Sequence, residues 1–466
     1  MNYKNEKLLE FNTFLKGKKV AIIGLGVSNI PLLEYMKVNN ANVTVFDEKE
    51  ENEANQEALE IVRKYNFQAN LGKDSLQELK GFDIVFRSPS CLPTRKELLE
   101  EKARGAIITS EIEMLMKLAP CKIIGVTGSD GKTTTTSLIY SILKEAGYNV
   151  YLGGNIGVPL FTKLEDILPQ DIIVLELSSF QLMGMELSPN IGVITNITPN
   201  HLNIHKDYNE YIEAKKNIFK YQTKDDIVIL NYDNEITRKC VQEAHSKVEL
   251  FSRNAKLDNG FIVDGNEIKE CEDGIRKHVL DTSEVLLRGK HNYENMATAL
   301  AATKTLVKTE IAVQAIKKFK SVEHRLEFVR EIDGCKWYND SVSSSPTRTI
   351  AGLNSFDEDI VLIAGGYDKN LDYTPIAKPI LDKVKTLILL GETSGKIFEA
   401  VKQEEEKSKK HIDIHMCETL QETINLAKRV AKPGEVVLFS PASASFDMFK
   451  NFADRGNQFK KLVNKL

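Results

Sequence analysis

The stretch VTGSDGKTTTT, residues 126–136, has the composition of a loop that binds the phosphates of a nucleotide. Gly128 and Gly131 lie in the loop, and Lys132 and Thr133 follow at once. In such loops backbone N–H groups surround the phosphates, the lysine contacts the terminal phosphates and the hydroxyl holds Mg²⁺. The apolar run before the stretch and the helical pattern after it favour this interpretation over a simple glycine turn.

Two positions depart from the usual pattern of such a loop. The pattern G-x-x-x-x-G-K-[ST] requires glycine where this chain has Val126. Asp130 adds a carboxylate, which would repel a phosphate at short range. We therefore expect the Asp130 side chain to point towards Mg²⁺-bound water, a neighbouring backbone N–H or solvent.

Other groups suited to metal or phosphate chemistry follow further apolar runs. Glu176 ends such a run, where an acid commonly completes a Mg²⁺ site; a buried structural acid is the alternative. His201 and His205 are four residues apart, as zinc ligands often are, but no cysteine or third histidine accompanies them. We expect one histidine near the phosphates and the other on the polar surface. The local pattern around Lys215, YIEAKKNIF, indicates only a solvated helix face.

Near the N-terminus, GLGVSN (24–29) has two of the three glycines of a dinucleotide-binding turn, and Asp47 ends the next apolar run. Asn29 occupies the third glycine position, so a plain turn is an equal alternative. A bound UDP group is as consistent with the pattern as NAD.

Clusters rich in hydroxyl, amide and charged groups recur towards the C-terminus: GKHNYEN (289–295), HRLE (324–327), NDSVSSSPT (339–347), GGYDKN (365–370) and SPASASFDMFKNFADRG (440–456). Arg325 and Lys369 in these clusters are candidate clamps for a phosphate or carboxylate. Singly, each cluster is equally well explained as a turn.

The elements that must position these groups are continuous apolar runs, each followed by a helical pattern. They are KVAIIGLG (19–26), KIIGVTGSDG (122–131), DIIVLELSS (171–179), IGVITNI (191–197), DIVLIAGG (359–366), TLILLGE (386–392) and EVVLFSPAS (435–443). Continuous runs indicate parallel strands buried on both faces, hence an α/β fold. Ligands in such sheets bind at the carboxyl ends of the strands, where the candidate groups lie.

A chain of 466 residues is long enough for about three domains. We expect boundaries at 1–108, 109–321 and 322–466, with three strand-like runs in the last domain. The net charge of −4 gives no reason to expect nucleic-acid binding. The six cysteines form no C-x-x-C pair, and no signal peptide or membrane-spanning run is evident, so we expect a soluble cytoplasmic protein.

Taken together, the motifs resemble the Mur ligase family over nearly the whole chain. They occur in the order TGSDGKTT, GGNIG, ELSSFQL, NITPNHL, AKKNIF, HNYEN, HRLE, NDS, GGYDK and SPASASFDMFKNFADRGNQF. ELSSFQL and the last segment are similar to the branch that adds D-glutamate to UDP-N-acetylmuramoyl-L-alanine. The resemblance implies a Rossmann-like N-terminal domain that binds UDP, a central P-loop ATPase-type domain with a parallel sheet, and a Rossmann-like C-terminal domain that binds the amino acid. It also implies ATP-dependent amide formation through an acyl phosphate, in peptidoglycan precursor synthesis.

The resemblance also implies roles for individual residues. Catalysis is assigned to Lys132, Glu176, His201 and Lys215, and metal ligation to Thr133, Glu176, His201 and Lys215. ATP binding is assigned to Gly128, Ser129, Asp130, Gly131, Lys132, Thr133, Thr134, Asn292, Asn295, Arg325 and Asp340. The UDP end falls to Val27, Ser28, Asp47, Glu48 and Ser88, the muramoyl-alanine part to Asn155 and Ser178, and D-glutamate to Ser344, Lys369, Ser445, Phe446 and Phe452.

Lys215 matches the lysine that family members carbamylate with CO₂, and the cofactors implied are ATP and two Mg²⁺ ions. We expect a monomer with small-molecule substrates and no nucleic-acid or membrane partner. The sequence departs from the family pattern at Val342 for lysine, Asn200 and Asn203 for aspartate, Ser90 for glycine and Lys49 for arginine.

Two alternatives remain open. One is a related ligase with another acceptor, such as a folylpolyglutamate ligase, against which the GLGVSN stretch argues. The other is a nucleotide-binding switch without chemistry.

Overall fold

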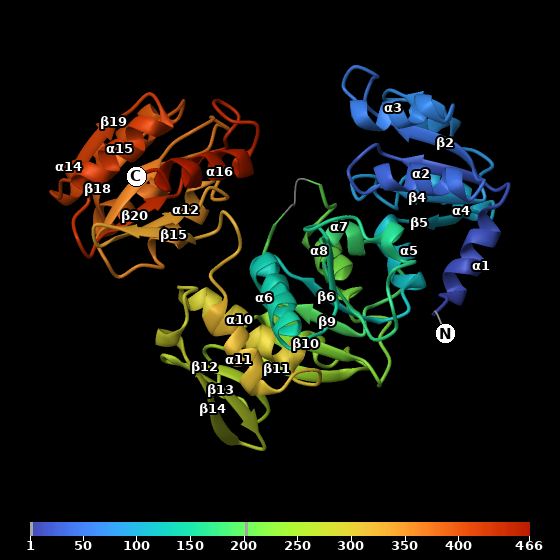
Figure 1. Ribbon diagram of the computed structural model, residues 1–466, viewed down its shortest axis with the longest axis horizontal. Helices are drawn as coiled ribbons and strands as arrows, with labels where there is room; N and C mark the ends of the chain where they lie inside the picture. Colours follow the sequence, from blue (N-terminus) through green and yellow to red (C-terminus); the bar gives the residue numbers. More distant parts are fainter. Residues whose placement is uncertain (1–2, 201–203) are drawn as a thin grey trace. The chain divides into compact units, whose positions relative to one another are not determined.

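A computed structural model describes residues 3–200 and 204–466. It contains three sheets, each flanked by helices (Figure 1). The chain divides into two compact units, residues 1–282 with 294–316 and residues 283–293 with 317–466. The predicted boundaries at residues 108 and 321 stay predictions.

The N-terminal sheet has the strand order β3-β2-β1-β4-β5, and all its strands are parallel. Its strands are β1 (Lys19–Ile23), β2 (Asn42–Asp47), β3 (Gln68–Leu71), β4 (Ile84–Arg87) and β5 (Ile107–Thr109). Its helices are α1 (Glu6–Leu15), α2 (Ile30–Val38), α3 (Gln56–Lys64), η1 (Ser75–Glu78) and α4 (Lys96–Ala103). Because β1 lies between β2 and β4, the residues that follow these three strands meet at one edge.

The central sheet has nine strands in the order β14-β13-β12-β11-β10-β9-β6-β8-β7. They are β6 (Lys122–Thr127), β7 (Val150–Gly154), β8 (Ile172–Glu176), β9 (Ile191–Ile194), β10 (Ile227–Asn231), β11 (Lys247–Ser252), β12 (Gly260–Asp264), β13 (Glu267–Glu272) and β14 (Ile275–Asp281). The helices are α5 (Glu111–Leu118), α6 (Lys132–Glu145), η2 (Phe161–Lys163), α7 (Ser179–Leu182), α8 (Tyr208–Lys216), α9 (Glu235–Cys240), η3 (Thr282–Glu284), α10 (Lys290–Thr303) and α11 (Thr309–Lys318). The sheet is parallel from β7 to β12. At its other edge, β12, β13 and β14 form an antiparallel meander.

The third sheet has the order β15-β16-β20-β17-β18-β19 and is parallel except for β15. The strands are β15 (Glu327–Ile332), β16 (Cys335–Asn339), β17 (Ile360–Ala364), β18 (Val384–Leu389), β19 (Asp413–Met416) and β20 (Val436–Phe439). The helices are α12 (Pro346–Leu353), α13 (Thr374–Lys383), α14 (Ser394–Ser408), α15 (Leu420–Val430) and α16 (Phe452–Val463).

The three strand-like runs of this last region are strands, and the six-stranded sheet contains three more that the sequence did not indicate. The predicted runs are β17, β18 and β20, whose residues are all buried apart from Lys385. β15 and β19 lie at the two edges of the sheet and are mostly half-buried or exposed, so they carry no continuous apolar run.

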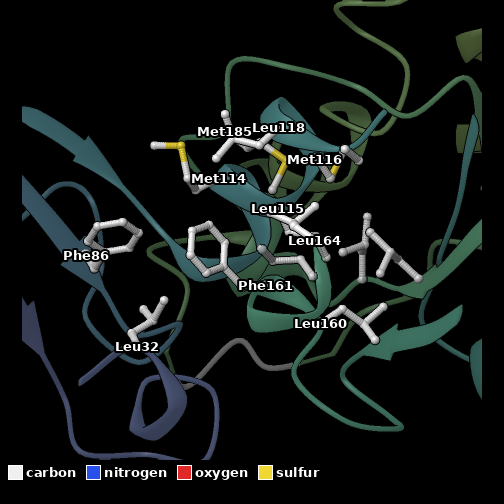
Figure 2. Packing of buried hydrophobic residues seen from close by; sticks show 14 of the residues in the cluster. Leu32, Phe86, Met114, Leu115, Met116, Leu118, Leu160, Phe161, Leu164 and Met185 are labelled. Carbon is white, nitrogen blue, oxygen red and sulfur yellow. The ribbon is translucent and has the colours of Figure 1, made fainter. Parts of the chain in front are cut away.

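In the first unit, α5 and η2 pack against the N-terminal sheet. Phe161 is 1% exposed and meets Tyr35 and Phe86 edge to face, with ring centroids 4.9 Å and 6.4 Å away. Figure 2 shows Phe161 beside Phe86, with Met114 and Leu115 of α5 in the same cluster. Burying one such ring stabilises the fold by roughly 2–3 kcal/mol. Across residues 3–200 and 204–466, no helix is long and apolar enough to span a bilayer.

Candidate active site

The predicted phosphate loop joins β6 to α6 (Figure 1). Gly128 and Gly131 have φ angles of +148° and +81°, which glycine adopts without strain. A Cβ atom on Gly128 would lie 1.9 Å from Oγ1 of Thr195, so that position also requires the missing side chain. The loop thus presents its backbone at the N-terminus of a fourteen-residue helix, where N–H groups and the helix dipole attract anions.

Residues after β9 hold the loop in place. The Thr195 hydroxyl donates a hydrogen bond of 2.6 Å to the carbonyl oxygen of Asp130, whose N–H donates to Oδ1 of Asn196 at 3.0 Å. The Ser129 hydroxyl shares a 2.8 Å hydrogen bond with the hydroxyl of Tyr211. Asp130 itself is exposed, which agrees with a side chain directed to solvent.

Lys132 is half-buried at the first position of α6. Its Nζ donates hydrogen bonds of 3.0 Å to the carbonyl oxygens of Gly128 and Ser129. The ammonium group therefore lies over the loop. Thr133 beside it is half-buried and Thr134 is buried.

Asn295 of α10 lies next to the loop. Its Oδ1 accepts a 3.3 Å hydrogen bond from the Thr135 hydroxyl and would lie 2.5 Å from a Cβ atom on Gly131. Asn292 belongs to the other compact unit, where its side chain donates to the carbonyl oxygen of Arg288 at 2.5 Å.

Glu176 ends β8, and in the β6–β8 pairing it lies opposite Val126, the start of the loop segment. It is 2% exposed, and its Oε1 accepts a 2.9 Å hydrogen bond from Nδ2 of Asn155. Among the described residues its Oε2 has no hydrogen-bond partner. A buried carboxylate oxygen left without a donor is expensive unless a cation binds there, so the site fits a hard cation such as Mg²⁺.

Lys215, the last-but-one residue of α8, is 1% exposed, and the solvated-surface alternative is therefore wrong. Its Nζ donates to the carbonyl oxygen of Gly128 at 2.8 Å and to Oγ1 of Thr127 at 3.2 Å, and lies 4.8 Å from the centre of the Tyr211 ring. Burial, reinforced by the positive charge of Lys132, lowers the pKa of Lys215 well below its usual value.

The histidine pair gives a mixed outcome. His201 lies outside the described residues. The expectation that the other histidine is polar surface was wrong: His205 is 3% exposed and its ring stacks on Phe180 at 4.8 Å. Its Nε2 shares a 2.9 Å hydrogen bond with the hydroxyl of Ser179, and its Nδ1 lies 3.3 Å from Oε2 of Glu210. His205 therefore ties α7 to the start of α8.

At the carboxyl edge of the N-terminal sheet, Gly24, Asp47 and Ser88 come together. Oδ2 of Asp47 accepts a 2.8 Å hydrogen bond from the N–H of Leu25, and a Cβ atom on Gly24 would lie 2.7 Å from Oγ of Ser88. The other predicted UDP contacts lie in the same loops: Val27 and Glu48 are exposed, and Ser28 is half-buried. The structure thus brings the loops that carry the predicted UDP contacts to one edge of the sheet.

The second unit contains Arg325 and Asp340. Asp340 is fully buried; its Oδ1 accepts from the N–H of Leu326 at 3.1 Å and its Oδ2 from the hydroxyl of Ser440 at 2.7 Å. Burial raises the pKa of Asp340. Arg325 is half-buried beside it, and its charge acts in the opposite direction on that pKa.

Three of the residues predicted to bind D-glutamate lie next to one another, and the other two have different neighbours. Nζ of Lys369 lies 5.6 Å from the centre of the Phe446 ring, which is 59% exposed, and Ser445 is buried next to it. Phe452 instead contacts the ring of His324, with the centroids 6.1 Å apart. Ser344 is half-buried, and its N–H donates to the carbonyl oxygen of Val342.

Comparisons with known proteins agree with this geometry. The family description "Mur ligase middle domain" matches residues 126–303, and "Mur ligase, glutamate ligase domain" matches residues 324–443. The chain is 47% identical over 464 residues to a protein from Acetivibrio thermocellus named UDP-N-acetylmuramoylalanine--D-glutamate ligase, with 99% of each chain covered. A protein of the same name from Clostridium kluyveri is 49% identical over 455 residues, with 98% of each covered. This chain belongs to the Mur ligase family.

Solved Mur ligase structures share the fold at low sequence identity. MurF from Acinetobacter baumannii aligns with a TM-score of 0.61 and 15% identity over 99% of both chains. UDP-N-acetylmuramate-alanine ligase MurC from Thermotoga maritima aligns with a TM-score of 0.59 and 17% identity, covering 96% of this chain and 99% of that one. The predicted α/β fold is thereby confirmed, and the structure builds it from three sheets.

Sequence reasoning missed residues that hold this Mur ligase site in shape. Tyr211 lies four residues before Lys215 on α8, and that helical spacing is the signal that could have identified it. Thr195 and Asn196 follow β9 directly, where ligands and loop anchors gather in parallel sheets. Arg95, whose guanidinium lies 2.7 Å from Glu48, has no comparable local signal.

Proposed function

We propose that this chain is an ATP-dependent amide ligase that adds D-glutamate to UDP-N-acetylmuramoyl-L-alanine. It works in the cytoplasm as a monomer and supplies a peptidoglycan precursor. The supporting observation is the convergence of Lys132, Glu176 and Lys215 around one glycine loop, in a chain whose relatives carry that activity in their names.

The reaction proceeds in two steps. An oxygen of the alanine carboxylate attacks the γ-phosphorus of ATP, the bond to the bridging oxygen breaks, and ADP leaves. The neutral amine of D-glutamate then attacks the carbonyl carbon of the acyl phosphate. The carbon–oxygen bond to phosphate breaks, inorganic phosphate leaves, and the nitrogen loses a proton to give the amide.

Lys132 neutralises charge as two anions approach each other. Its Nζ contacts two carbonyl groups of the loop, and with ATP bound it would contact the terminal phosphate. The backbone N–H groups at the start of α6 would hold the other phosphates. Asn295, next to Gly131, would contact the bound nucleotide.

Mg²⁺ would be held by Oε2 of Glu176 and the hydroxyl of Thr133. Bound there, it supplies charge stabilisation to the phosphate oxygens. Both are hard oxygen donors, which suits this ion. The orphaned Oε2 is the observation that supports its presence.

Lys215 would act as a carbamate. The neutral amine attacks CO₂, a carbon–nitrogen bond forms, one carbon–oxygen π bond of CO₂ opens onto oxygen, and the nitrogen releases one proton. The neutral amine thereby becomes an anionic oxygen ligand. The lowered pKa of Lys215 supports this, because only the neutral amine reacts. The carbamate and His201 would hold the second Mg²⁺ ion.

The substrate would be bound at both ends. Val27, Ser28, Asp47, Glu48 and Ser88 would hold the UDP end, and Asn155 and Ser178 the muramoyl-alanine part. Lys369, Ser445, Phe446, Phe452 and Ser344 would receive D-glutamate, and Arg325, Asp340 and Asn292 would complete the ATP site.

A substrate panel read by phosphate release tests the proposal. Release is expected only when ATP, UDP-N-acetylmuramoyl-L-alanine and D-glutamate are all present. Equal turnover with L-lysine, diaminopimelate or a folate substrate would instead establish a ligase with another acceptor. Hydrolysis independent of any carboxylate substrate would establish a nucleotide switch.

A further inference from the structure

Arg87, the last residue of β4, joins two segments that lie far apart in the sequence. It is 4% exposed, and its Nη1 donates to the carbonyl oxygens of Cys91 at 3.2 Å and Phe180 at 3.4 Å. Its Nη2 donates to the carbonyl oxygen of Met183. One guanidinium group therefore holds the loop after β4 against α7 and the turn that ends it.

The same two segments touch again directly beyond this link. Gly184 has a φ angle of +77°, and a Cβ atom there would lie 2.9 Å from Cβ and Cγ of Pro93. The backbone of Gly184 therefore packs directly against the ring of Pro93, with no room for a side chain between them. A third contact lies at the surface, where Nζ of Lys102 is 3.1 Å from Oε1 of Glu186.

A buried guanidinium is a costly way to fill this space. Burial lowers the pKa of Arg87, and the nearby Cys91 and Glu113 offset part of that effect. The Glu113 carboxylate itself accepts hydrogen bonds from the hydroxyl of Thr109 and the N–H of Glu186. Well-packed apolar side chains often stabilise such a position more than a charge does. The planar guanidinium group instead donates to three carbonyl groups at once, and it thereby fixes the relative positions of the two segments that carry them.

Both segments lead into positions that the proposed function assigns to one substrate. Ser88, assigned to the UDP end, is the next residue after Arg87. Ser178, assigned to the muramoyl-alanine part, caps the N-terminus of α7 and follows Glu176 by two residues. The substrate must reach from one segment to the other, and a misplacement of about 1 Å at the reacting end can reduce the rate roughly 100-fold.

We infer that Arg87 is a positioning residue that sets the distance between the UDP site and the acyl-transfer site. This inference rests on the proposed function. Arg87 touches neither substrate nor reacting atoms; it fixes the two segments that do.

The test compares Arg87→Met and Arg87→Lys with wild type, and uses Lys102→Met as the matched control on the surface link. The kcat for phosphate release with the full substrate set is expected to fall by about 100-fold in Arg87→Met. In Arg87→Lys, which can reach one carbonyl group, it is expected to fall by about 10-fold. The melting temperature of each variant shows whether it is folded. The dissociation constants of UDP alone and of ADP alone show whether each of the two binding sites is intact. Each constant should change by less than about threefold, because each binding site is local.

The outcomes are distinct. A kcat in Arg87→Met within about threefold of wild type would overturn the inference. So would a parallel loss of UDP binding, ADP binding and kcat, because that pattern indicates general loss of structure. An inactive wild-type enzyme with this substrate set would overturn the proposed function and the inference together. Lys102→Met should keep wild-type kcat; a loss equal to that of Arg87→Met would show that any contact between the segments matters and would also overturn the role of Arg87.

Discussion

Nζ of Lys215 lies 2.8 Å from the carbonyl oxygen of Gly128 and 3.2 Å from Oγ1 of Thr127. A neutral amine has two N–H donors, and these two acceptors match them. Desolvation and the nearby charge of Lys132 both favour the neutral form. The buried amine is thus attached to the carbonyl side of the loop whose N–H groups face a nucleotide.

The pH dependence of stability should report this buried amine. Because the pKa of Lys215 is lowered on folding, the unfolded chain binds more protons between that lowered pKa and 10.5. Stability therefore rises with pH across this window. In CO₂-free buffer, where Lys215 stays an amine, we expect the melting temperature of wild type to rise relative to that of Lys215→Met as the pH rises towards 10.5. The exposed Lys224→Met is the control, and parallel curves for wild type and Lys215→Met would contradict the assignment.

Gly128→Ala should abolish nucleotide binding. The new Cβ atom would lie 1.9 Å from Oγ1 of Thr195 at a φ angle of +148°, so the loop must move. We expect at least about 100-fold weaker ADP binding, from a strain of about 1–3 kcal/mol added to the lost N–H contacts.

Gly147→Ala is the matched control for this change. Gly147 also has a positive φ angle, +88°, but nothing lies within 4 Å of the added Cβ atom. It should lose about 1 kcal/mol of stability and keep its affinity for ADP. Equal ADP affinity in the two variants would show that the close approach at Gly128 is unimportant.

Glu111→Gln tests a buried carboxylate in the first unit. Burial raises the pKa of Glu111 to about 7, although the N–H groups of Phe161 and Leu160 partly oppose the shift. The folded chain then binds more protons than the unfolded chain between pH 4.5 and about 7, so stability falls as pH rises through this window. The fall is on the order of 3 kcal/mol. Glu111→Gln should remove this fall in stability when melting curves are recorded across the pH window, whereas Glu10→Gln, at an exposed position, should not. The same dependence of stability on pH in Glu111→Gln as in wild type would refute the raised pKa of Glu111.

Asp130→Asn should leave ATP binding nearly unchanged. Asp130 is exposed, and it is held through its backbone by Thr195 and Asn196. We expect the KM for ATP to change by less than about threefold. Much tighter ATP binding in the variant would show that the carboxylate faces the phosphates.

The sequence predicts the parts of this fold that are buried on both faces. β6, β8 and β17 are continuous apolar runs because helices cover both sides of their sheets, and the loop after β6 contains its own glycines and lysine. β19 is an exposed edge strand, whose side chains obey no apolar pattern.

The site is less predictable where its environment is built by distant segments. The local pattern of Lys215 is that of a surface lysine, and it is buried because the loop 87 residues earlier covers it. His205 is buried by Phe180 and Ser179, again from another element. Such burial depends on how distant segments pack together, and the local sequence pattern around a residue does not predict that packing.

Transfer of an oxygen isotope tests the central claim most directly. The alanine carboxylate of UDP-N-acetylmuramoyl-L-alanine is labelled with ¹⁸O, and the inorganic phosphate from one turnover with ATP and D-glutamate is analysed by mass spectrometry. An acyl phosphate requires one carboxylate oxygen to leave with the phosphate, so the account predicts phosphate carrying a single ¹⁸O atom for each amide formed. Unlabelled phosphate released alongside the amide would contradict it.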